Sequence, residues 1–250
     1  MIRTKLAPLL AAGLLLHTAP PLAAEFPAVL DWSGRVSLTL PVSGVLDQVH
    51  ARAGQVVKKG ELLASLEPTL FKTTIAENRA DLDRISEEHA DAKRDLDRVQ
   101  ELYARTVSAT TELDAAKLRF ARAQSGLAAV QARLERARRL LAESELHAPF
   151  DALILARPGE PGMVITSQCQ PAAVFSVARA DELIARAQAD ATQVETVRIG
   201  GEAEVQVAGK ILKGKVAGLS VQADGRFGIE VAIPRQAGLL AGRQATLRLP

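Results

Sequence analysis

Apolar residues return every seven positions along the middle of the chain, between residues 69 and 144. In the second half of this stretch, one row consists of Leu113, Phe120, Leu127, Leu134 and Leu141, and a second of Ala116, Ala123, Val130 and Ala137. The rows of the first half are Ile75, Leu82, His89, Leu96 and Tyr103, and Asn78, Ile85, Ala92 and Val99. The stretch has no proline and one glycine. Heptads sustained over this length predict a coiled coil.

The heptads are interrupted once, by the β-branched and hydroxyl-bearing residues 106–111. Because this break lies near the middle, the two predicted helices have matching lengths and are expected to fold back antiparallel. Each helix of about 35 residues would span roughly 50 Å. Residues Glu112 and Asp114 are expected in the first turn of the second helix, where acidic groups complement the helix dipole. The candidate capping residues for that helix are Ser108, Thr110 and Thr111.

Two short segments on either side of this hairpin resemble each other. Residues 41–66 and 149–174 align at a constant offset of 108 positions, which matches Gly54 with Gly162 and Leu66 with Val174. Apolar pairs around a glycine-centred turn are typical of short strands. Neither copy is long enough to bury a core alone, so the two are predicted to form one small β-sandwich that the hairpin interrupts.

After residue 178 the pattern changes to alternating apolar and polar positions. The predicted strands are residues 183–189, 203–207, 211–221 and 227–233, with glycine-rich turns between them and a short helix beginning at Asp190. The alternation of Val36, Leu38 and Leu40 is expected to add another strand to this region. The fold class is therefore α+β: a lipoyl-like β-sandwich interrupted by a long antiparallel coiled-coil hairpin and followed by a small antiparallel β-barrel.

The first 24 residues have the layout of a secretory signal peptide. Arg3 and Lys5 precede an apolar run, and small residues follow up to a cleavage site expected near Ala24. The remaining chain holds 29 basic and 29 acidic side chains. This balance argues against nucleic acid or an acidic membrane surface as a partner. The one cysteine, Cys169, cannot form an intrachain disulfide and is interpreted as a small packing residue.

The sequence offers no constellation that would carry catalysis, a cofactor or a metal ion. Outside the signal peptide the histidines His50, His89 and His147 lie in three different elements without metal-ligand spacing. There is no phosphate-cradling glycine loop and no nucleophile elbow. His89 and Asn78, which occupy seam positions, are interpreted as packing variants that help to set register. We therefore expect a protein that is not an enzyme.

Residues 43–46 and 53–63 resemble the first half of a biotinyl/lipoyl domain. Residues 146–154 resemble the closing half found in periplasmic adaptors, also called membrane fusion proteins, in which a helical hairpin splits the lipoyl domain and a β-barrel follows. The chain resembles short resistance-nodulation-division efflux adaptor subunits. The expected domains are a signal peptide (1–24), an N-terminal strand region joining the barrel (25–40), the two halves of the lipoyl-like domain (41–68 and 145–178), the hairpin (69–144) and the β-barrel (179–250).

The resemblance implies an adaptor in the periplasm, associated with the inner membrane through its partners. Those partners would be an inner-membrane efflux transporter, an outer-membrane channel and further copies of the chain in a homo-oligomeric ring. The family pattern at the hairpin tip places a Leu four residues after an Arg and a Ser seven residues later. It maps the channel contact onto Arg98, Leu102 and Ser108, the last of which comes one residue early.

The sequence departs from the family pattern in two further places. Ala152 replaces the glycine of the family's Pro-Phe-Asp-Gly motif, a mild change where the backbone keeps a negative φ. Larger family members continue into a membrane-proximal domain, most of which we expect this chain to lack.

Two other functions stay open at this stage. One is an adaptor for an ATP-driven exporter or a type I secretion system. The other is a biotin or lipoyl carrier, which presents a modified lysine at the turn between the two halves. Residues 66–69 contain no lysine, and Lys72 falls within the predicted helix, which disfavours the carrier.

Overall fold

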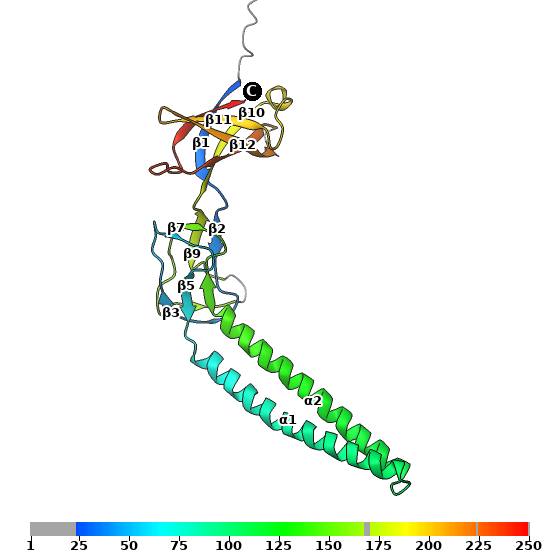
Figure 1. The fold of residues 1–250 in the computed structure, drawn as a ribbon. Helices are drawn as coiled ribbons and strands as arrows, with labels where there is room; N and C mark the ends of the chain where they lie inside the picture. The colour runs from blue at the N-terminus through cyan, green and yellow to red at the C-terminus, as the bar shows by residue number, and fades with distance from the viewer. Residues whose placement is uncertain (1–23, 168–170, 224, 250) are drawn as a thin grey trace, which may run out of the picture. The chain divides into compact units, whose positions relative to one another are not determined.

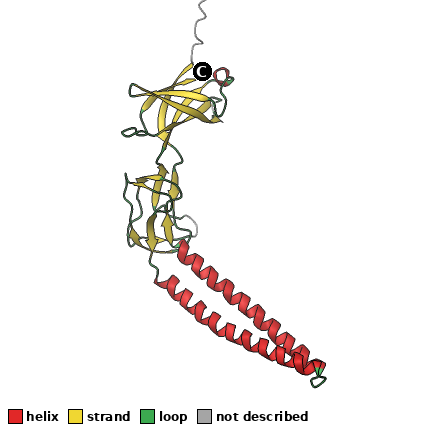
Figure 2. Ribbon diagram, in the orientation of Figure 1, coloured by secondary structure: helices red, strands yellow, loops and turns green. Residues whose placement is uncertain are grey.

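The computed structural model describes residues 24–167, 171–223 and 225–249. The predicted signal peptide, apart from Ala24, and Cys169 lie outside the described residues. The chain divides into two compact units, residues 32–181 and residues 24–31 together with 182–249. Figures 1 and 2 show that the first unit contains a β-sandwich and a long helical hairpin, and that the second is a β-barrel. The predicted α+β architecture is confirmed.

The sandwich consists of two four-stranded sheets. One has the order β2 (Val36–Leu38), β9 (Phe175–Arg179), β7 (Ala152–Ala156) and β4 (Val56–Val57). The other has the order β6 (Glu145–His147), β5 (Leu62–Leu66), β3 (Gly44–Val49) and β8 (Val164–Ile165). Both sheets combine strands that precede the hairpin with strands that follow it.

The two sequence copies interlock through their backbones. Strand β3 pairs antiparallel with β8, and β4 pairs antiparallel with β7. The Gly54 amide donates to the Ile154 carbonyl at 2.8 Å, and the Ile154 amide donates to the Gln55 carbonyl at 2.9 Å. Side chains from both copies fill one shared core, including the fully buried Leu40, Leu46, Leu63, Leu66, Ile154, Ile165 and Phe175.

The hairpin consists of α1 (Thr69–Ala104) and α2 (Thr110–Glu143). Every residue of the four predicted seam rows is buried or half-buried except Tyr103, which is 42% exposed near the end of α1. Leu96, Val99, Leu113 and Ala116 form a buried apolar cluster within the seam. His89 packs its ring against Phe120 with centroids 5.1 Å apart. None of the described helices has an apolar stretch long enough to span a membrane.

The barrel closes in the order β1-β10-β13-β12-β11-β14. Its strands are β1 (Ala24–Trp32), β10 (Glu182–Ala189), β11 (Glu202–Val207), β12 (Lys210–Val221), β13 (Phe227–Pro234) and β14 (Gln244–Leu249). Alternate residues such as Leu183, Val205, Ile229 and Leu247 are buried, as the period of two along a strand requires. The short helix α3 (Ala191–Val194) follows Asp190, which forms a capping box with Gln193.

The N-terminal strand region, expected to join the barrel over residues 25–40, is divided between the two units. Strand β1 pairs with β14 in the barrel, whereas β2 pairs with β9 in the sandwich, with Val36 opposite Val177. The expectation that Val36, Leu38 and Leu40 add a barrel strand is therefore wrong. Leu38 and Leu40 are instead buried in the sandwich core, because the chain leaves the barrel after Trp32 and turns at Gly34, where φ is +58°.

Two glycines should respond in opposite ways to replacement by alanine. At Gly126, a half-buried position in the middle of α2, an added Cβ would meet only Ile85 Cγ2 at 3.8 Å, so Gly126→Ala should raise the free energy of unfolding by about 1 kcal/mol. At Gly159 an added Cβ would lie 2.5 Å from Val174 Cγ1, so Gly159→Ala should lower it by about 1–3 kcal/mol. Urea unfolding checks both values, and a shift of the same sign in the two variants would contradict this account.

Candidate functional site

The hairpin tip is a tight turn closed by two backbone hydrogen bonds. The Thr106 amide donates to the Tyr103 carbonyl and the Val107 amide to the Leu102 carbonyl, both at 2.9 Å. This is the bonding pattern of a Schellman motif, in which the residue after the helix cap adopts a left-handed conformation. Thr106 occupies that position, with φ +63°.

A threonine is an unusual residue for this position. Glycine normally fills it, because a β-branched side chain crowds the backbone when φ is positive. Holding such a residue there costs on the order of 1–3 kcal/mol. Thr106 and Ala208 are the only described residues other than glycine with a positive φ. The tip therefore keeps a defined turn at a cost in backbone strain.

The structure brings Leu102 and Ser108 to this turn and places Arg98 one helical turn before Leu102 on α1. Leu102 is 36% exposed, and its carbonyl is the acceptor that closes the motif. The side chain of Arg98 is 70% exposed and bridges to Asp95. Ser108 donates through Oγ to the Glu112 carboxylate. The proximity of Glu112 also helps to raise the pKa of Arg98, after the larger effect of its hydrogen bond to Asp95.

The predicted capping of α2 is wrong. Ala109, with extended backbone at φ −77° and ψ 151°, is the residue before the helix, and no side chain caps it. Ser108 therefore lies one position too early to cap, while Thr110 and Thr111 already belong to the first turn. The expected dipole complement is present at Glu112.

A charged cluster that sequence reasoning missed lies below the tip. Asp95, whose side chain is only 18% exposed, accepts hydrogen bonds from Arg98 on its own helix and from Arg119 on α2. The hydrogen bond from Arg98, with the charge of Arg119, lowers the pKa of Asp95. These residues border a hollow of about 570 Å³ on the hairpin, also lined by Glu88, Asp91, Ala92 and Arg94. The contact spans 24 positions in sequence, so only the register of the two helices reveals it.

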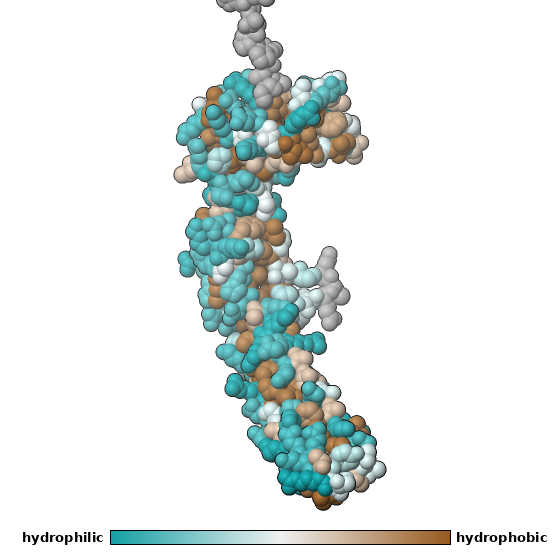
Figure 3. Space-filling view, turned by 45° about the vertical axis from the view of Figure 1, so that its right-hand side comes forward, coloured by the Kyte–Doolittle hydropathy of each residue, from teal (hydrophilic) through white to brown (hydrophobic). Residues whose placement is uncertain are grey.

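The tip also exposes apolar side chains. Val107 is 72% exposed and Tyr103 42% exposed, and brown, hydrophobic atoms reach the very end of the hairpin in Figure 3. A small apolar surface next to charged groups is suited to docking against another protein.

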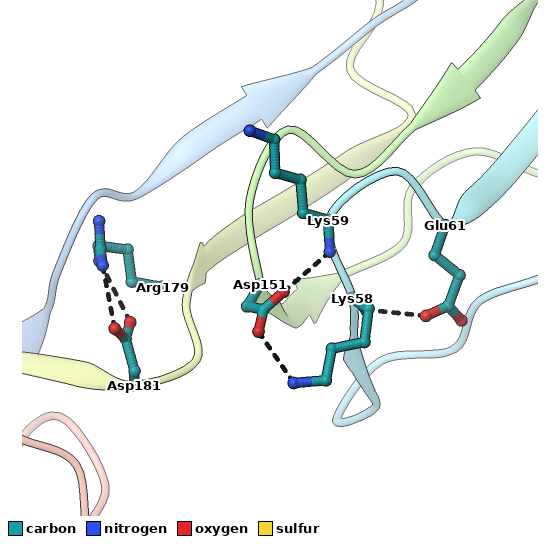
Figure 4. A network of polar contacts seen from close by, with 6 residues as sticks. All are labelled: Lys58, Lys59, Glu61, Asp151, Arg179 and Asp181. Carbon is teal, nitrogen blue, oxygen red and sulfur yellow. Dashed lines mark hydrogen bonds and ion pairs between the residues drawn. The ribbon is translucent and has the colours of Figure 1, made fainter.

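A second polar network ties the two sequence copies together in the sandwich. The Asp151 carboxylate accepts from Lys58 Nζ and from the Lys59 amide, each at 2.9 Å, and the Lys58 amide donates to Glu61 at 2.8 Å (Figure 4). The hydrogen bond from Lys58, followed by that from the Lys59 amide, lowers the pKa of Asp151. Beside it, Arg179 holds Asp181 through two contacts at 3.0 and 3.2 Å. The Lys58–Asp151 pair thus joins the two sequence copies at the surface of the sandwich.

The structure also describes two positions at which the sequence was compared with lipoyl domains, Ala152 and the turn at residues 66–69. Ala152 is buried, and its φ is not positive, so the backbone there accepts alanine without strain. Residues 66–69 lead directly into α1, and Lys72 lies within the first turn. A lysine is therefore missing from the place where a carrier domain would present it.

Among the described residues, no group of three or more His, Cys, Asp and Glu side chains could hold a metal ion. Residues 35–179 match the family model of the CzcB-like barrel-sandwich hybrid domain. The chain belongs to the periplasmic adaptor, or membrane fusion protein, family. It is therefore a non-catalytic adaptor of tripartite efflux systems. No curated protein sequence matches it significantly.

Solved structures share the fold of this adaptor. A MacA–MexA chimeric protein containing the Pseudomonas aeruginosa MexA α-hairpin domain aligns with 90% of this chain and 80% of its own, at 17% identity and a TM-score of 0.71. MacA from Actinobacillus actinomycetemcomitans aligns over 90% and 78%, at 17% identity and a TM-score of 0.64. ZneB from Cupriavidus metallidurans aligns over 91% and 97%, at 19% identity and a TM-score of 0.53.

Replacing Thr106 with glycine should stabilise the adaptor. Glycine adopts the left-handed conformation without the crowding that threonine suffers, so Thr106→Gly should raise the unfolding free energy by about 1 kcal/mol. Ser108→Gly is the matched control in the same turn and should not stabilise. Urea unfolding followed by circular dichroism measures both. A destabilised Thr106→Gly protein would contradict the assignment of strain to this residue.

The Asp151 network should make stability depend on pH in the acid range. A carboxylate whose folded-state pKa is lowered contributes stability above its unfolded pKa of about 3.9, and loses that contribution as pH falls through the folded pKa. Asp151→Asn should therefore lower stability at neutral pH and flatten its decline below about pH 4. Asp83→Asn, on an exposed face of α1, is the control and should leave the profile unchanged. Unfolding measured from pH 7 to pH 2 tests both variants.

Proposed function

We propose that this adaptor bridges an inner-membrane efflux transporter, of the resistance-nodulation-division class that its sequence resembles, to an outer-membrane channel. Several copies form a ring for this purpose. The observation that carries the proposal is a hairpin about 50 Å long that ends in a fixed turn with exposed apolar residues, beside the exposed Arg98 of α1. The hairpin supplies reach, and the tip supplies the surface for the channel.

The three predicted tip residues have separate roles in this proposal. Leu102 and its neighbours Tyr103 and Val107 provide the apolar contact. Arg98 provides a charge whose position is set by Asp95. Ser108 shapes the turn through Glu112 rather than capping α2. The contact is thus a small mixed surface, which fits reversible docking better than permanent assembly.

Substitutions at the tip should abolish export while leaving the fold intact. Burial of a leucine side chain contributes about 1.5–3 kcal/mol, so Leu102→Asp should weaken channel binding by tenfold or more. Arg98→Glu should act in the same direction by reversing the charge. Arg79→Glu, on α1 far from the tip, is the matched control. Each variant is introduced into a deletion strain and tested for tolerance to a panel of antibiotics, dyes and metal salts.

The expected result is sensitivity close to that of the deletion strain for both tip variants and full tolerance for Arg79→Glu, at equal protein levels. Full tolerance in both tip variants would refute the tip assignment. Sequencing the N-terminus of the exported protein tests the proposed periplasmic location, with a new terminus at residue 25 expected.

A second candidate function is an adaptor for an ATP-driven exporter or a type I secretion system, since neither the family model nor the shared fold distinguishes between transporter classes. The energy source of the partner separates the two candidates. Crosslinking in cells followed by identification of the captured inner-membrane protein should yield a proton-driven transporter for the first candidate and an ATPase for the second.

A further inference from the structure

The outer surface of the barrel carries a groove over four neighbouring strands, β1, β10, β13 and β12. Its volume is about 510 Å³, which lies in the range of pockets that hold small molecules. Because neighbouring strands lie about 4.8 Å apart, the groove can extend for about 14 Å across the sheet. The side chains that form this barrel groove include Pro27, Val29, Arg186, Gln188, Ser220 and Glu230.

Two outward-facing glycines leave room in and beside the barrel groove. Gly228 pairs with Gln188 on one side and with Ser220 on the other. A Cβ at Gly228 would stand 2.7 Å from Ser220 Oγ, so a side chain there would have to displace Ser220. Gly218 pairs with Glu230, and a Cβ at Gly218 would stand 3.7 Å from Glu230 Oε2. That carboxylate oxygen therefore borders a space that a side chain would otherwise occupy.

Pro27 and Val29 give the barrel groove an apolar wall. Alternate residues of β1 are buried in the barrel, so the period of two along a strand directs Pro27 and Val29 outward. Val29 is 48% exposed, and Pro27 is exposed as well. The outward positions of β1 on either side of them carry the acids Glu25 and Asp31. The wall thus offers an apolar contact that the barrel itself does not use.

One end of the barrel groove carries excess negative charge. Arg186 Nε donates to Glu230 Oε1 at 3.0 Å, and Arg186 Nη1 donates to Asp31 Oδ2 at 2.6 Å. A single guanidinium is therefore shared by two carboxylates, and the three groups together have a net charge of −1. In the part of the chain that the structure describes, Glu230 Oε2 has no hydrogen-bond or ion-pair partner. This oxygen is available to a ligand.

The lining selects one class of ligand. An anion would meet the excess carboxylate, because Arg186 is already engaged by both acids. A metal ion would find no group of three or more His, Cys, Asp and Glu side chains among the described residues. A protein partner needs a much larger contact area than a groove of this size provides. An organic cation with an apolar body matches both the wall and the charge.

We propose that the barrel groove binds a small amphipathic cation, with its apolar body against Pro27 and Val29 and its positive charge at Glu230 Oε2. Arg186 is a positioning residue, because it holds the other oxygen of the Glu230 carboxylate. The adaptor thus recognises such a molecule itself, in addition to the bridging role proposed above. Binding requires neither the transporter nor the channel.

Rhodamine 6G and fluorescein test the required charge of the ligand. Both dyes have a flat tricyclic xanthene core, but at neutral pH rhodamine 6G is a cation and fluorescein is an anion. In fluorescence anisotropy titrations with the purified protein, rhodamine 6G should show saturable binding to one site. Fluorescein should bind at least about tenfold more weakly, because Glu230 repels it. No saturable binding of rhodamine 6G, or equal affinity for the two dyes, would overturn the proposal.

Two substitutions test the location of the site. Glu230→Gln removes the charge and should weaken rhodamine 6G binding about tenfold. Val29→Ser removes part of the apolar wall and should weaken it several-fold. The matched controls are Glu204→Gln on β11 and Ile211→Ser at the start of β12, both exposed and outside the groove, and they should bind the dye as the native protein does. Unchanged affinity in Glu230→Gln or Val29→Ser, or an equal loss in the controls, contradicts the assignment.

Circular dichroism verifies that each variant keeps its strands. The tip variant Leu102→Asp should bind rhodamine 6G with native affinity, since the tip lies outside the barrel groove. Conversely, Glu230→Gln should leave the binding of the channel unchanged. Failure of the dye experiments is therefore distinct from failure of the proposed channel contact.

Discussion

The structure depends on antiparallel pairing between strands that lie on opposite sides of a long insertion. Strand β5 pairs with β6, and the Leu66 amide donates to the Ser144 carbonyl at 2.9 Å. This pairing closes a loop of about 75 residues, which costs conformational entropy that grows only slowly with loop length. The shared sandwich core offsets that cost. Because the helices start and end at neighbouring strands, the sandwich holds both of them at their base. Beyond the base, only the apolar seam between the two helices holds them together.

In the hairpin, the residues that stabilise the fold and the residues that are exposed for binding lie on different surfaces. Its stability comes from one narrow apolar seam, so its outer surfaces are free to carry charge. Near the tip, Asp95 joins both helices through Arg98 and Arg119, which links the register of the rod to the orientation of a predicted docking residue. The strained Thr106 turn then ends the rod in a fixed shape. The tip can therefore carry a docking surface without altering the seam that holds the two helices together.

Much of this fold could be predicted from the sequence because its patterns are local or repeated. The heptads identified buried residues such as Leu96 and Leu134 correctly, and the offset of 108 identified the two halves of the sandwich. The failures involve choices that local patterns do not determine. Val36 and Leu38 alternate as any strand does, and only their partner Val177 assigns them to the sandwich. Ser108 is a typical capping residue, but α2 begins after Ala109, one position later than a Ser108 cap requires. Ser108 instead donates a hydrogen bond to the Glu112 carboxylate. The Asp95–Arg119 bridge required the register of two helices.

The way the hairpin is attached also affects how such a protein can change length. Both helices contact the sandwich only at their base, and each heptad contacts mainly the heptad level with it on the other helix. Removing seven residues from α1 and seven level residues from α2 would preserve the seam, the tip and the strand pairing of β5 with β6. The distance spanned would change by about 10 Å for each such pair. The gap that an adaptor of this design bridges is thus adjustable in discrete steps, independently of the domains at its base.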